Sequence, residues 1–322
     1  MSDLAPSPAP GGSGQAGELP GATPELLATV RPGIELCYQA FGDPAARPLL
    51  LVMGLGGPMT WWPLELCRQL VDEGFYVVRF DNRDTGHSTK LRRHRVTQRD
   101  LVRAFVRRRV PVPYSLRDMS DDAVALLDHL GIEAAHVAGV SMGGMIAQTM
   151  AIEHPDRVLS LTSIMSTTGA RRSGYQDPML LPQLIKRQGR SREEYVEGAV
   201  AFGRLIGSPS YRGSDEDARE RARETYDRGI CLSGTMRQML AIVTQRDRTV
   251  ALRQVQVPTT VVHGLSDRMV HVSGGRATAA AVPGAELVLV DGMGHDLPEG
   301  VFPILVSAIR RSASRAEADA NA

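Results

Sequence analysis

The sequence predicts an α/β fold: a mostly parallel central sheet flanked by helices, with a helical cap inserted between two late strands. Short apolar runs that fit buried strands alternate with amphipathic helical stretches along most of the 322 residues. Such alternation is typical of a parallel sheet covered by helices on both faces. A second observation predicts the cap, because strand-like runs are missing from 167–249 and return at 259–264.

The predicted strands are short apolar runs bounded by glycine or polar residues. Runs of this length with these boundaries favour strands over helices. In chain order the predicted strands are residues 48–54, 75–81, 135–140, 158–166, 259–264 and 286–292.

Helical spacing of apolar residues fills the intervals between the strands. Residues 64–74 and 119–131 each end on a glycine of the kind that stops a helix. Ser120, followed by two aspartates, is the expected start of the second of these helices. In the insertion, residues 191–207 and 214–229 alternate charged and apolar residues at helical spacing.

The two ends of the chain differ in composition from the rest. The first residues are rich in Pro, Gly, Ala and Ser and lack the basic start and apolar block of a secretory signal, so they predict a disordered leader. The last residues are expected to fray. The predicted boundaries are a leader at 1–25, an α/β core at 26–166 and 250–312, a cap at 167–249 and a flexible tail at 313–322.

Charge and cysteine content narrow the function classes. The 37 Lys and Arg nearly balance the 36 Asp and Glu, giving a net charge of +1 and no global reason to expect a nucleic-acid partner. No apolar run approaches the roughly 18 to 20 residues that cross a bilayer. Cys37, Cys67 and Cys231 are widely scattered, which favours reduced thiols in the cytoplasm, with one surface disulfide and a spare thiol as the alternative.

A single serine interrupts the apolar stretch "HVAGVSMGGMIAQ" at 136–148. Gly139, Ser141 and Gly143 make the spacing G-x-S-x-G, between a predicted strand and a predicted helix at 142–155. At such a turn the serine backbone is strained, its Oγ projects above the sheet, and the glycines let strand and helix pass closely. The context predicts Ser141 as a nucleophile, although a pattern with three fixed positions also occurs by chance.

Candidates for a base and an orienting acid follow the last two predicted strands. A serine hydroxyl is a poor nucleophile at neutral pH and needs both partners. Asp267 follows the strand at 259–264, and His295 follows the strand at 286–292. Both lie just beyond the carboxyl end of a strand, where open parallel sheets place their sites. Ser141, Asp267 and His295 are therefore the predicted triad.

Rival side chains are weaker candidates. Asp291 and Asp296 bracket His295, but at this sequence distance they are poorly placed to reach its Nδ1. His87 lies on a loop that could border the site, whereas most of the other histidines fit structural positions.

Acyl transfer also needs hydrogen-bond donors where negative charge develops on the carbonyl oxygen. The backbone N–H of Met142, at the start of a helix, is one predicted donor. The glycine-rich turn after the strand at 48–54 supplies the second, with Leu55 as the candidate and Gly56 as the alternative.

Six motifs together resemble the α/β-hydrolase family, and the resemblance covers about residues 26–312. They are "VMGLGGPMTWW", "RFDNRDTGHS", "GVSMGGMIAQ", "SIMSTTG", "HGLSDRMV" and "GMGHDLP". They look most like the bacterial esterase and lipase branch that includes the aclacinomycin methylesterases. The resemblance implies a serine hydrolase with the triad named above and a helical cap over its pocket. Met53 stands where the family's oxyanion loop usually has histidine, which removes a bracing side chain but no backbone donor.

The expected function is that of a serine esterase or lipase-like carboxylesterase cleaving a small to medium acyl ester or a methyl ester through an acyl-enzyme on Ser141. Thioesters, lactones and the carbon–carbon bond of a diketone are alternative substrates, because this fold hosts all of these reactions, and a non-catalytic receptor is the alternative outside enzymes. The sequence has no metal-binding cluster or dinucleotide fingerprint, so no cofactor or metal is expected.

Gly56, Trp61 and Trp62 are the expected pocket residues. The two tryptophans are the only ones in the chain and lie just past the oxyanion loop. The alternative is that they anchor the following helix.

Residues 90–109 carry an unusual charge. One Lys and eight Arg against Asp100 alone give the segment a charge of +8. Leu101, Val102, Phe105 and Val106 share one side of its helical part. A basic amphipathic helix can contact anionic lipid, whereas the alternative is a solvated segment balanced by the acidic stretch at 214–224.

Overall fold

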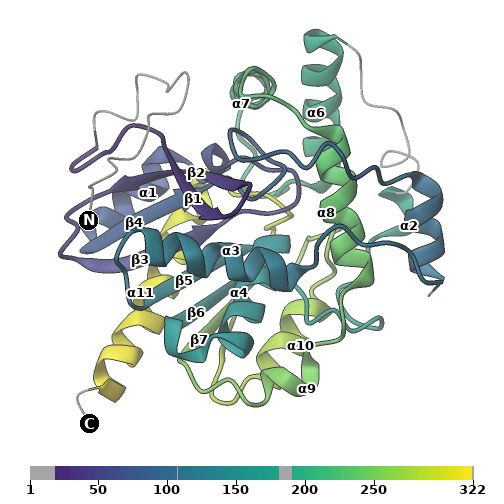
Figure 1. The fold of residues 1–322 in the computed structure, drawn as a ribbon. Helices are drawn as coiled ribbons and strands as arrows, with labels where there is room; N and C mark the ends of the chain where they lie inside the picture. Colours follow the sequence, from purple (N-terminus) through teal and green to yellow (C-terminus); the bar gives the residue numbers. More distant parts are fainter. Residues whose placement is uncertain (1–18, 107, 181–190, 321–322) are drawn as a thin grey trace.

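The central element of the computed structural model is one eight-stranded sheet (Figure 1). The structure describes residues 19–106, 108–180 and 191–320. The strand order is β1-β2-β4-β3-β5-β6-β7-β8, with β1 and β2 antiparallel to their neighbours and the remaining pairs parallel. The strands are β1 (Leu26–Arg31), β2 (Ile34–Phe41), β3 (Arg47–Val52), β4 (Phe75–Phe80), β5 (Ala135–Val140), β6 (Val158–Ile164), β7 (Thr259–Gly264) and β8 (Glu286–Val290).

The predicted fold class is confirmed, and all six predicted strands are present in the parallel part of the sheet. Strands β1 and β2 add an antiparallel edge that the apolar runs did not predict. Their hairpin turns at Gly33, whose φ of 77° suits glycine.

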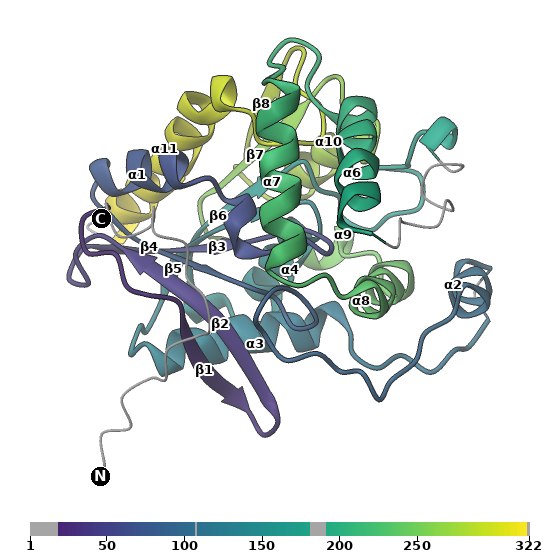
Figure 2. The same cartoon turned by 90° about the horizontal axis from the view of Figure 1, so that it is seen from above.

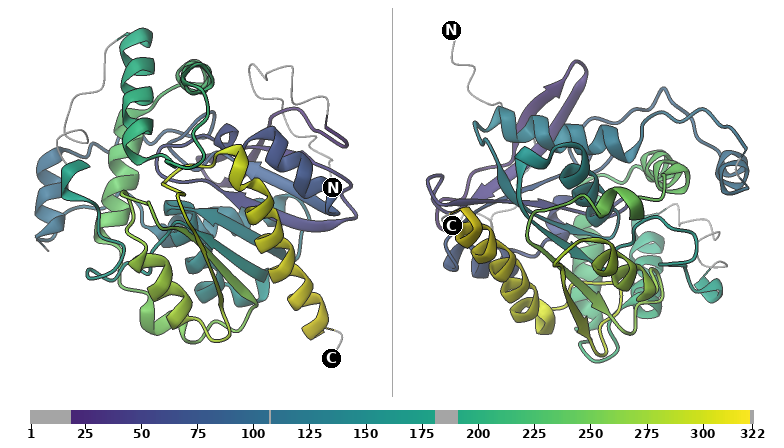
Figure 3. Two further views of the ribbon diagram at one scale, coloured as in Figure 1. Left: turned by 180° about the vertical axis from the view of Figure 1, so that it is seen from behind. Right: turned by 90° about the horizontal axis from the view of Figure 1, so that it is seen from below.

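Helices cover both faces of the sheet, as Figures 2 and 3 show from other directions. The side chains of Leu49 and Leu51 belong to the apolar core shared with α1 and α11, and those of Leu50 and Val52 to the core shared with α3 and α4. Successive residues of a strand point to opposite faces, so a strand buried on both faces is apolar throughout. The helices of the two layers are α1 (Leu64–Asp72) and α11 (Phe302–Ala320) on one face, and α3 (Leu116–His129), α4 (Met142–Glu153) and α10 (Ser273–Ala281) on the other.

Between β6 and β7, the described residues form helices and loops and no strand, in agreement with the helices expected near 191–207 and 214–229. We call residues 167–249 the insertion. Its α6 and α7 contact each other, and its α8 lies between the sheet and α2 (Gln98–Phe105), which projects at the periphery in both Figures 1 and 2. Among the described residues, the helices of this part are α6 (Arg192–Ile206), α7 (Asp215–Asp227), α8 (Leu232–Thr244) and α9 (Thr249–Leu252), and the short 3₁₀ turns are η2 (Met59–Trp61), η3 (Pro155–Arg157), η4 (Pro178–Leu180) and η5 (Glu299–Val301).

The expectation of a disordered leader at 1–25 is wrong for residues 19–25, while residues 1–18 lie outside the described part. Leu19 is buried in the core, and the amide of Thr23 donates to the carbonyl of Ala40 at 2.9 Å. Glu25 is also buried, with its carboxylate bound to Arg228. The segment is ordered because it extends the hairpin edge of the sheet.

The expectation of a flexible tail at 313–322 is wrong for residues 313–320. Helix α11 continues to Ala320, Ala313 is fully buried, and Arg315 lies 3.4 Å from the carboxylate of Glu286 on β8. Residues 321 and 322 lie outside the described part. Small residues such as Ala313 let the helix pack closely on the sheet.

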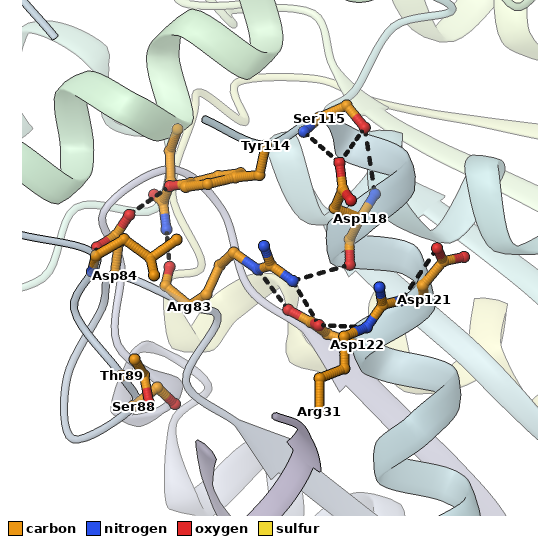
Figure 4. Close-up of polar contacts among 12 residues, drawn as sticks. Arg31, Arg83, Asp84, Ser88, Thr89, Tyr114, Ser115, Asp118, Asp121 and Asp122 are labelled. Carbon is orange, nitrogen blue, oxygen red and sulfur yellow. Dashed lines mark hydrogen bonds and ion pairs between the residues drawn. The ribbon is translucent and has the colours of Figure 1, made fainter. Parts of the chain in front are cut away.

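Helix α3 begins at a different serine from the one expected. The Oγ of Ser115 accepts from the Asp118 amide, and the Asp118 carboxylate accepts from the Ser115 amide at 2.7 Å (Figure 4). This reciprocal pair is a capping box. Ser120 instead lies inside the helix, and its buried Oγ has no hydrogen-bond partner within the part of the chain that the structure describes.

None of the helices in the described ranges is both long enough and apolar enough to cross a membrane.

Candidate active site

Ser141 lies at the sharp turn between β5 and α4. Its φ of 57° and ψ of −118° place the backbone in a region that residues with a side chain rarely adopt. The Ser141 amide donates to the carbonyl of Ile164 on β6 at 2.9 Å, and its carbonyl accepts from Ser166 Oγ at 2.8 Å. These bonds from the neighbouring strand and the loop after it hold the turn in its strained form.

The glycines around Ser141 are required by close contacts between backbones. A Cβ atom on Gly139 would lie 2.2 Å from the carbonyl oxygen of Gly143, and one on Gly143 would lie 2.0 Å from the carbonyl oxygen of Val52. Neither distance is sterically allowed. Glycine at both positions therefore lets the start of α4 press against β5 and β3, which brings Ser141 to the carboxyl edge of the sheet.

The three predicted triad residues meet at this edge. His295 Nε2 lies 2.9 Å from Ser141 Oγ, and His295 Nδ1 lies 2.7 Å from Asp267 Oδ2. An ionised carboxylate can only accept, so Nδ1 carries the proton and Nε2 of the neutral ring is free to accept from the serine hydroxyl. This is the tautomer that a general base for Ser141 requires.

Asp267 is held by its own loop and by a histidine that the sequence analysis set aside. Its Oδ1 accepts from the amides of Met269 and Val270, both at 2.8 Å. His263 on β7 lies with its Nε2 3.5 Å from Asp267 Oδ2. Burial alone would raise the pKa of Asp267, but His295 and His263 outweigh burial and hold this pKa below its usual range. The carboxylate is therefore charged at neutral pH.

The glycine-rich loop after β3 lies against Ser141. A Cβ atom on Gly54 would be 3.2 Å from Ser141 Cβ. The Gly56 amide donates to Gln238 Oε1 at 2.8 Å, whereas the Leu55 amide has no acceptor among the described residues. The amide of Met142 is the first of α4 and has no carbonyl within the helix to bond. These contacts favour Leu55 over Gly56 as the second oxyanion donor.

The side chain of Asn82 braces this loop. The buried Asn82 side chain donates from Nδ2 to the carbonyl of Met53 at 2.9 Å. Asn82 was not among the predicted site residues, although it stands in the motif "RFDNRDTGHS".

The three expected pocket residues have different surroundings. Trp62 is fully buried in the core beside α1, so the expectation that it lines a pocket is wrong and the anchoring alternative holds for it. Trp61 is 37% exposed, and its indole N–H donates to Thr225 of α7 at 2.9 Å. Gly56 lines a cavity of about 30 Å³ together with Thr225 and Thr235, so the loop after β3 faces the insertion.

The rival side chains lie elsewhere. His87 Nδ1 lies 3.0 Å from Glu25 Oε2, so its ring bonds the hairpin edge of the sheet rather than a triad residue. Asp296 accepts hydrogen bonds from Ser208 of the insertion rather than from His295.

Three side chains of residue types that commonly bind metals lie close together. The ligand atoms of Glu25, Cys37 and His87 lie within 4.8 Å of one another. The guanidinium of Arg228 already supplies the positive charge there, at 2.6 Å from Glu25 and 2.8 Å from Asp81. Burial also raises the pKa of the Cys37 thiol, which disfavours the thiolate that a metal would bind. This cluster therefore fits an ion-pair network better than a metal centre.

The loop after β4 joins the core to the insertion. Asp84 accepts from Arg237 of α8 at 2.6 and 2.7 Å and from Tyr114 at 2.7 Å, the last of which is visible in Figure 4. Gln238 donates to the carbonyl of Arg83 at 2.8 Å. Asp84 and Arg237 have no exposed side-chain surface, so charge pairing holds α8 in a buried position.

Comparison with known proteins agrees with this geometry. Residues 47–299 match the family described as alpha/beta hydrolase fold. Rhodomycin D methylesterase DnrP of Streptomyces peucetius is 29% identical over 300 residues, covering 86% of this chain and 94% of that protein.

Two solved structures share the fold. A thermophilic esterase from Thermogutta terrifontis is 23% identical with a TM-score of 0.64, over 91% of this chain and 99% of that one. A meta-cleavage product hydrolase from Pseudomonas fluorescens IP01 is 16% identical with a TM-score of 0.67, over 88% of this chain and 96% of that one.

Proposed function

The chain belongs to the alpha/beta hydrolase fold family, and we propose that it hydrolyses carboxylic esters through an acyl-enzyme on Ser141. The observation that carries the proposal is the continuous hydrogen-bonded chain from Ser141 through His295 to Asp267. Its relatives include methylesterases, so ester hydrolysis of a small molecule is the reaction class of the protein.

In the proposed reaction, His295 takes the proton of Ser141 as Oγ attacks the ester carbonyl. Asp267 holds the imidazole in the required tautomer and stabilises the positive ring. The amides of Met142 and Leu55 donate to the developing oxyanion. The alcohol leaves with a proton from His295, and water then releases the acid from Ser141 by the same steps.

A methyl ester or a small to medium acyl ester is the proposed substrate class. Support comes from the 29% identity to a rhodomycin D methylesterase over most of both chains. Thioesters, lactones and carbon–carbon bonds of diketones use the same nucleophile and are outcomes of the test below. We place the proposed cap at residues 167–249, whose Thr225 and Thr235 face the loop that follows β3.

The test is hydrolysis of p-nitrophenyl esters from acetate to laurate by the wild type and by Ser141→Ala. Loss of the nucleophile should lower turnover by roughly four or more orders of magnitude while folding is kept. Activity of Ser141→Ala within about tenfold of wild type would end the assignment. A wild type inactive on every ester, yet labelled at Ser141 by a fluorophosphonate, would favour the other acyl-type bonds.

We further propose a peripheral contact between residues 90–109 and anionic lipid. Val102, Phe105 and Val106 are all more than half exposed. Among the described residues, no carboxylate forms an ion pair with the seven exposed arginines around them, which are Arg92, Arg93, Arg95, Arg99, Arg103, Arg108 and Arg109.

The acidic stretch expected to balance this charge pairs within the insertion. Asp215 is bound to Arg204, and Glu216 to Arg223 and Arg219. An apolar face rimmed by exposed arginines fits the headgroup region of an anionic bilayer. Co-sedimentation should require phosphatidylserine vesicles, weaken with salt and fall in Phe105→Ala; equal binding to neutral phosphatidylcholine vesicles would refute the contact. The three free thiols support the cytoplasm as the proposed location.

A further inference from the structure

The segment after α6 lies directly on the loop that carries His295. The amide of His295 donates to the carbonyl of Ile206, the last residue of α6, at 2.7 Å. The preceding amide, that of Gly294, donates to Ser208 Oγ at 2.8 Å. The last carbonyls of a helix have no N–H partner within the helix. Here the amide of His295 is the partner of one of these carbonyls. The backbone of the loop that carries His295 is thus hydrogen-bonded to the insertion.

The residue after His295 completes this contact. Asp296 Oδ1 accepts from the Ser208 amide at 3.0 Å and from the Ser208 hydroxyl at 2.5 Å. Ser208 is only 1% exposed, so water does not replace these bonds. Three consecutive residues, 294–296, are therefore each hydrogen-bonded to the segment 206–208, and Ser208 is bonded to the residues on both sides of His295.

Glycines bring the two segments into backbone contact. A Cβ atom on Gly294 would lie 2.4 Å from the carbonyl carbon of Gly207, and one on Gly207 would lie 2.9 Å from Asp296 Oδ2. Neither position has room for a side chain. The two segments therefore cannot slide past each other without breaking the hydrogen bonds that join them.

Within the described part of the chain, the ring of His295 is hydrogen-bonded to Asp267 and Ser141 alone. Its loop is fixed on one side by the acid loop, where the Ser266 amide donates to the carbonyl of Met293 at 3.0 Å. The bonds from residues 206–208 fix it on another side. The position of the imidazole relative to Ser141 thus depends on both sets of backbone bonds.

We propose that Ser208 and Asp296 are positioning residues for His295, so that the end of α6 sets the place of the general base. This inference rests on the proposed role of His295 as the base for Ser141. Proton transfer is sensitive to small displacements of the base, and a shift of about 1 Å can cost up to roughly a hundredfold in rate. Neither residue contacts Ser141, so the effect falls on kcat rather than on KM.

The experiment measures kcat and KM on p-nitrophenyl esters for four variants of the full chain. Ser208→Ala removes the hydroxyl that bridges Gly294 and Asp296, and Asp296→Ala removes the acceptor. Asp296→Asn keeps an oxygen that accepts from both donors of Ser208 and is the conservative rescue. Ser210→Ala is the matched control, because Ser210 is exposed and bonds the His295 loop at Gly292 only through its backbone amide.

We expect kcat to fall roughly tenfold in Ser208→Ala and Asp296→Ala with KM within about twofold of wild type. Asp296→Asn and Ser210→Ala should keep kcat within about twofold. Labelling of Ser141 by a fluorophosphonate should slow by a similar factor in the two damaging variants, because this attack also needs the base.

An unchanged kcat in Ser208→Ala would overturn the proposal, and so would a loss confined to KM. If Asp296→Ala loses its folded circular dichroism spectrum, Ser208→Ala alone decides. Failure of the proposed function is a different result, namely wild-type activity that survives Ser141→Ala. If that activity vanishes in Ser141→Ala while Ser208→Ala stays fully active, only the positioning role is refuted.

Discussion

The carboxyl edge of the sheet and the insertion meet around Ser141, but different interactions hold them. At the edge, Ser141, Asp267 and His295 follow strands of an apolar sheet, and backbone contacts fix their loops. The insertion is held on the core largely by buried charge, with Arg228 bound to two carboxylates and Arg237 to Asp84.

This difference separates two kinds of substitution. Changes at the strand ends should remove activity with little loss of stability, because the apolar sheet folds without those side chains. Changes to the buried arginines should cost stability first, because a buried charge left without its partner is strongly unfavourable. The predictions below test this separation.

Asp267→Asn should have the largest effect. Its amide would donate to Nδ1 of His295 and leave the proton on Nε2, so the ring could no longer accept from Ser141. We expect kcat to fall by roughly three to four orders of magnitude, the size known for the equivalent change in other serine hydrolases. Steady-state kinetics measure the loss, and a thermal midpoint far below wild type would contradict the separation.

Arg237→Ala should have the largest effect on stability. Removal of the guanidinium leaves the buried Asp84 carboxylate without its main partner, a change that typically costs about 3 to 5 kcal/mol. Urea unfolding at neutral pH measures the loss. A cost close to zero would show that charge pairing does not hold the insertion.

The loss of stability in Arg237→Ala should also depend on pH. Burial alone would raise the pKa of Asp84, but hydrogen bonds from Arg237 and Tyr114 hold it below its usual value. The stabilisation is thus present above the unfolded carboxyl's pKa and is lost as the pH falls through the lower folded pKa. The deficit of Arg237→Ala should therefore shrink in acid; a deficit that grows in acid would contradict this linkage.

Ser115→Ala and Ser120→Ala form a matched pair within α3. Ser115 caps the helix, so its loss should cost about 1 kcal/mol, whereas Ser120 caps nothing and its loss should cost nothing measurable. Urea unfolding compares the two. Equal losses would restore Ser120 as the start of the helix.

Arg204→Ala should have the smallest effect. Its ion pair with Asp215 joins two exposed side chains on the surface of the insertion. Exposed pairs contribute little because water screens them. The unfolding midpoint should match that of wild type within error, and a loss comparable with that of Arg237→Ala would remove the distinction between buried and surface pairs.

The strand ends could be predicted because their signals are local. The apolar runs, the glycines around Ser141 and the polar residues that follow the last two strands all stand next to one another in the sequence. The hairpin of β1 and β2 was missed because β1 is only partly buried and carries no long apolar run.

The contacts between the insertion and the core could not be predicted in the same way. Arg228 and Arg237 look like the many surface arginines of the insertion, and their partners lie 203 and 153 residues away in the chain. Nothing in the sequence distinguishes Ser208 from other serines, because its partners lie in the distant His295 loop. Only the folded chain shows which charges are buried.

The most direct test of the account is stoichiometric labelling with a fluorophosphonate, followed by peptide mapping, in the wild type and in His295→Gln. The account predicts one label per wild-type chain, attached to Ser141, and labelling slower by roughly three orders of magnitude in His295→Gln. A label on another residue, or equal rates in the two proteins, would contradict the claim that Ser141 is activated by His295.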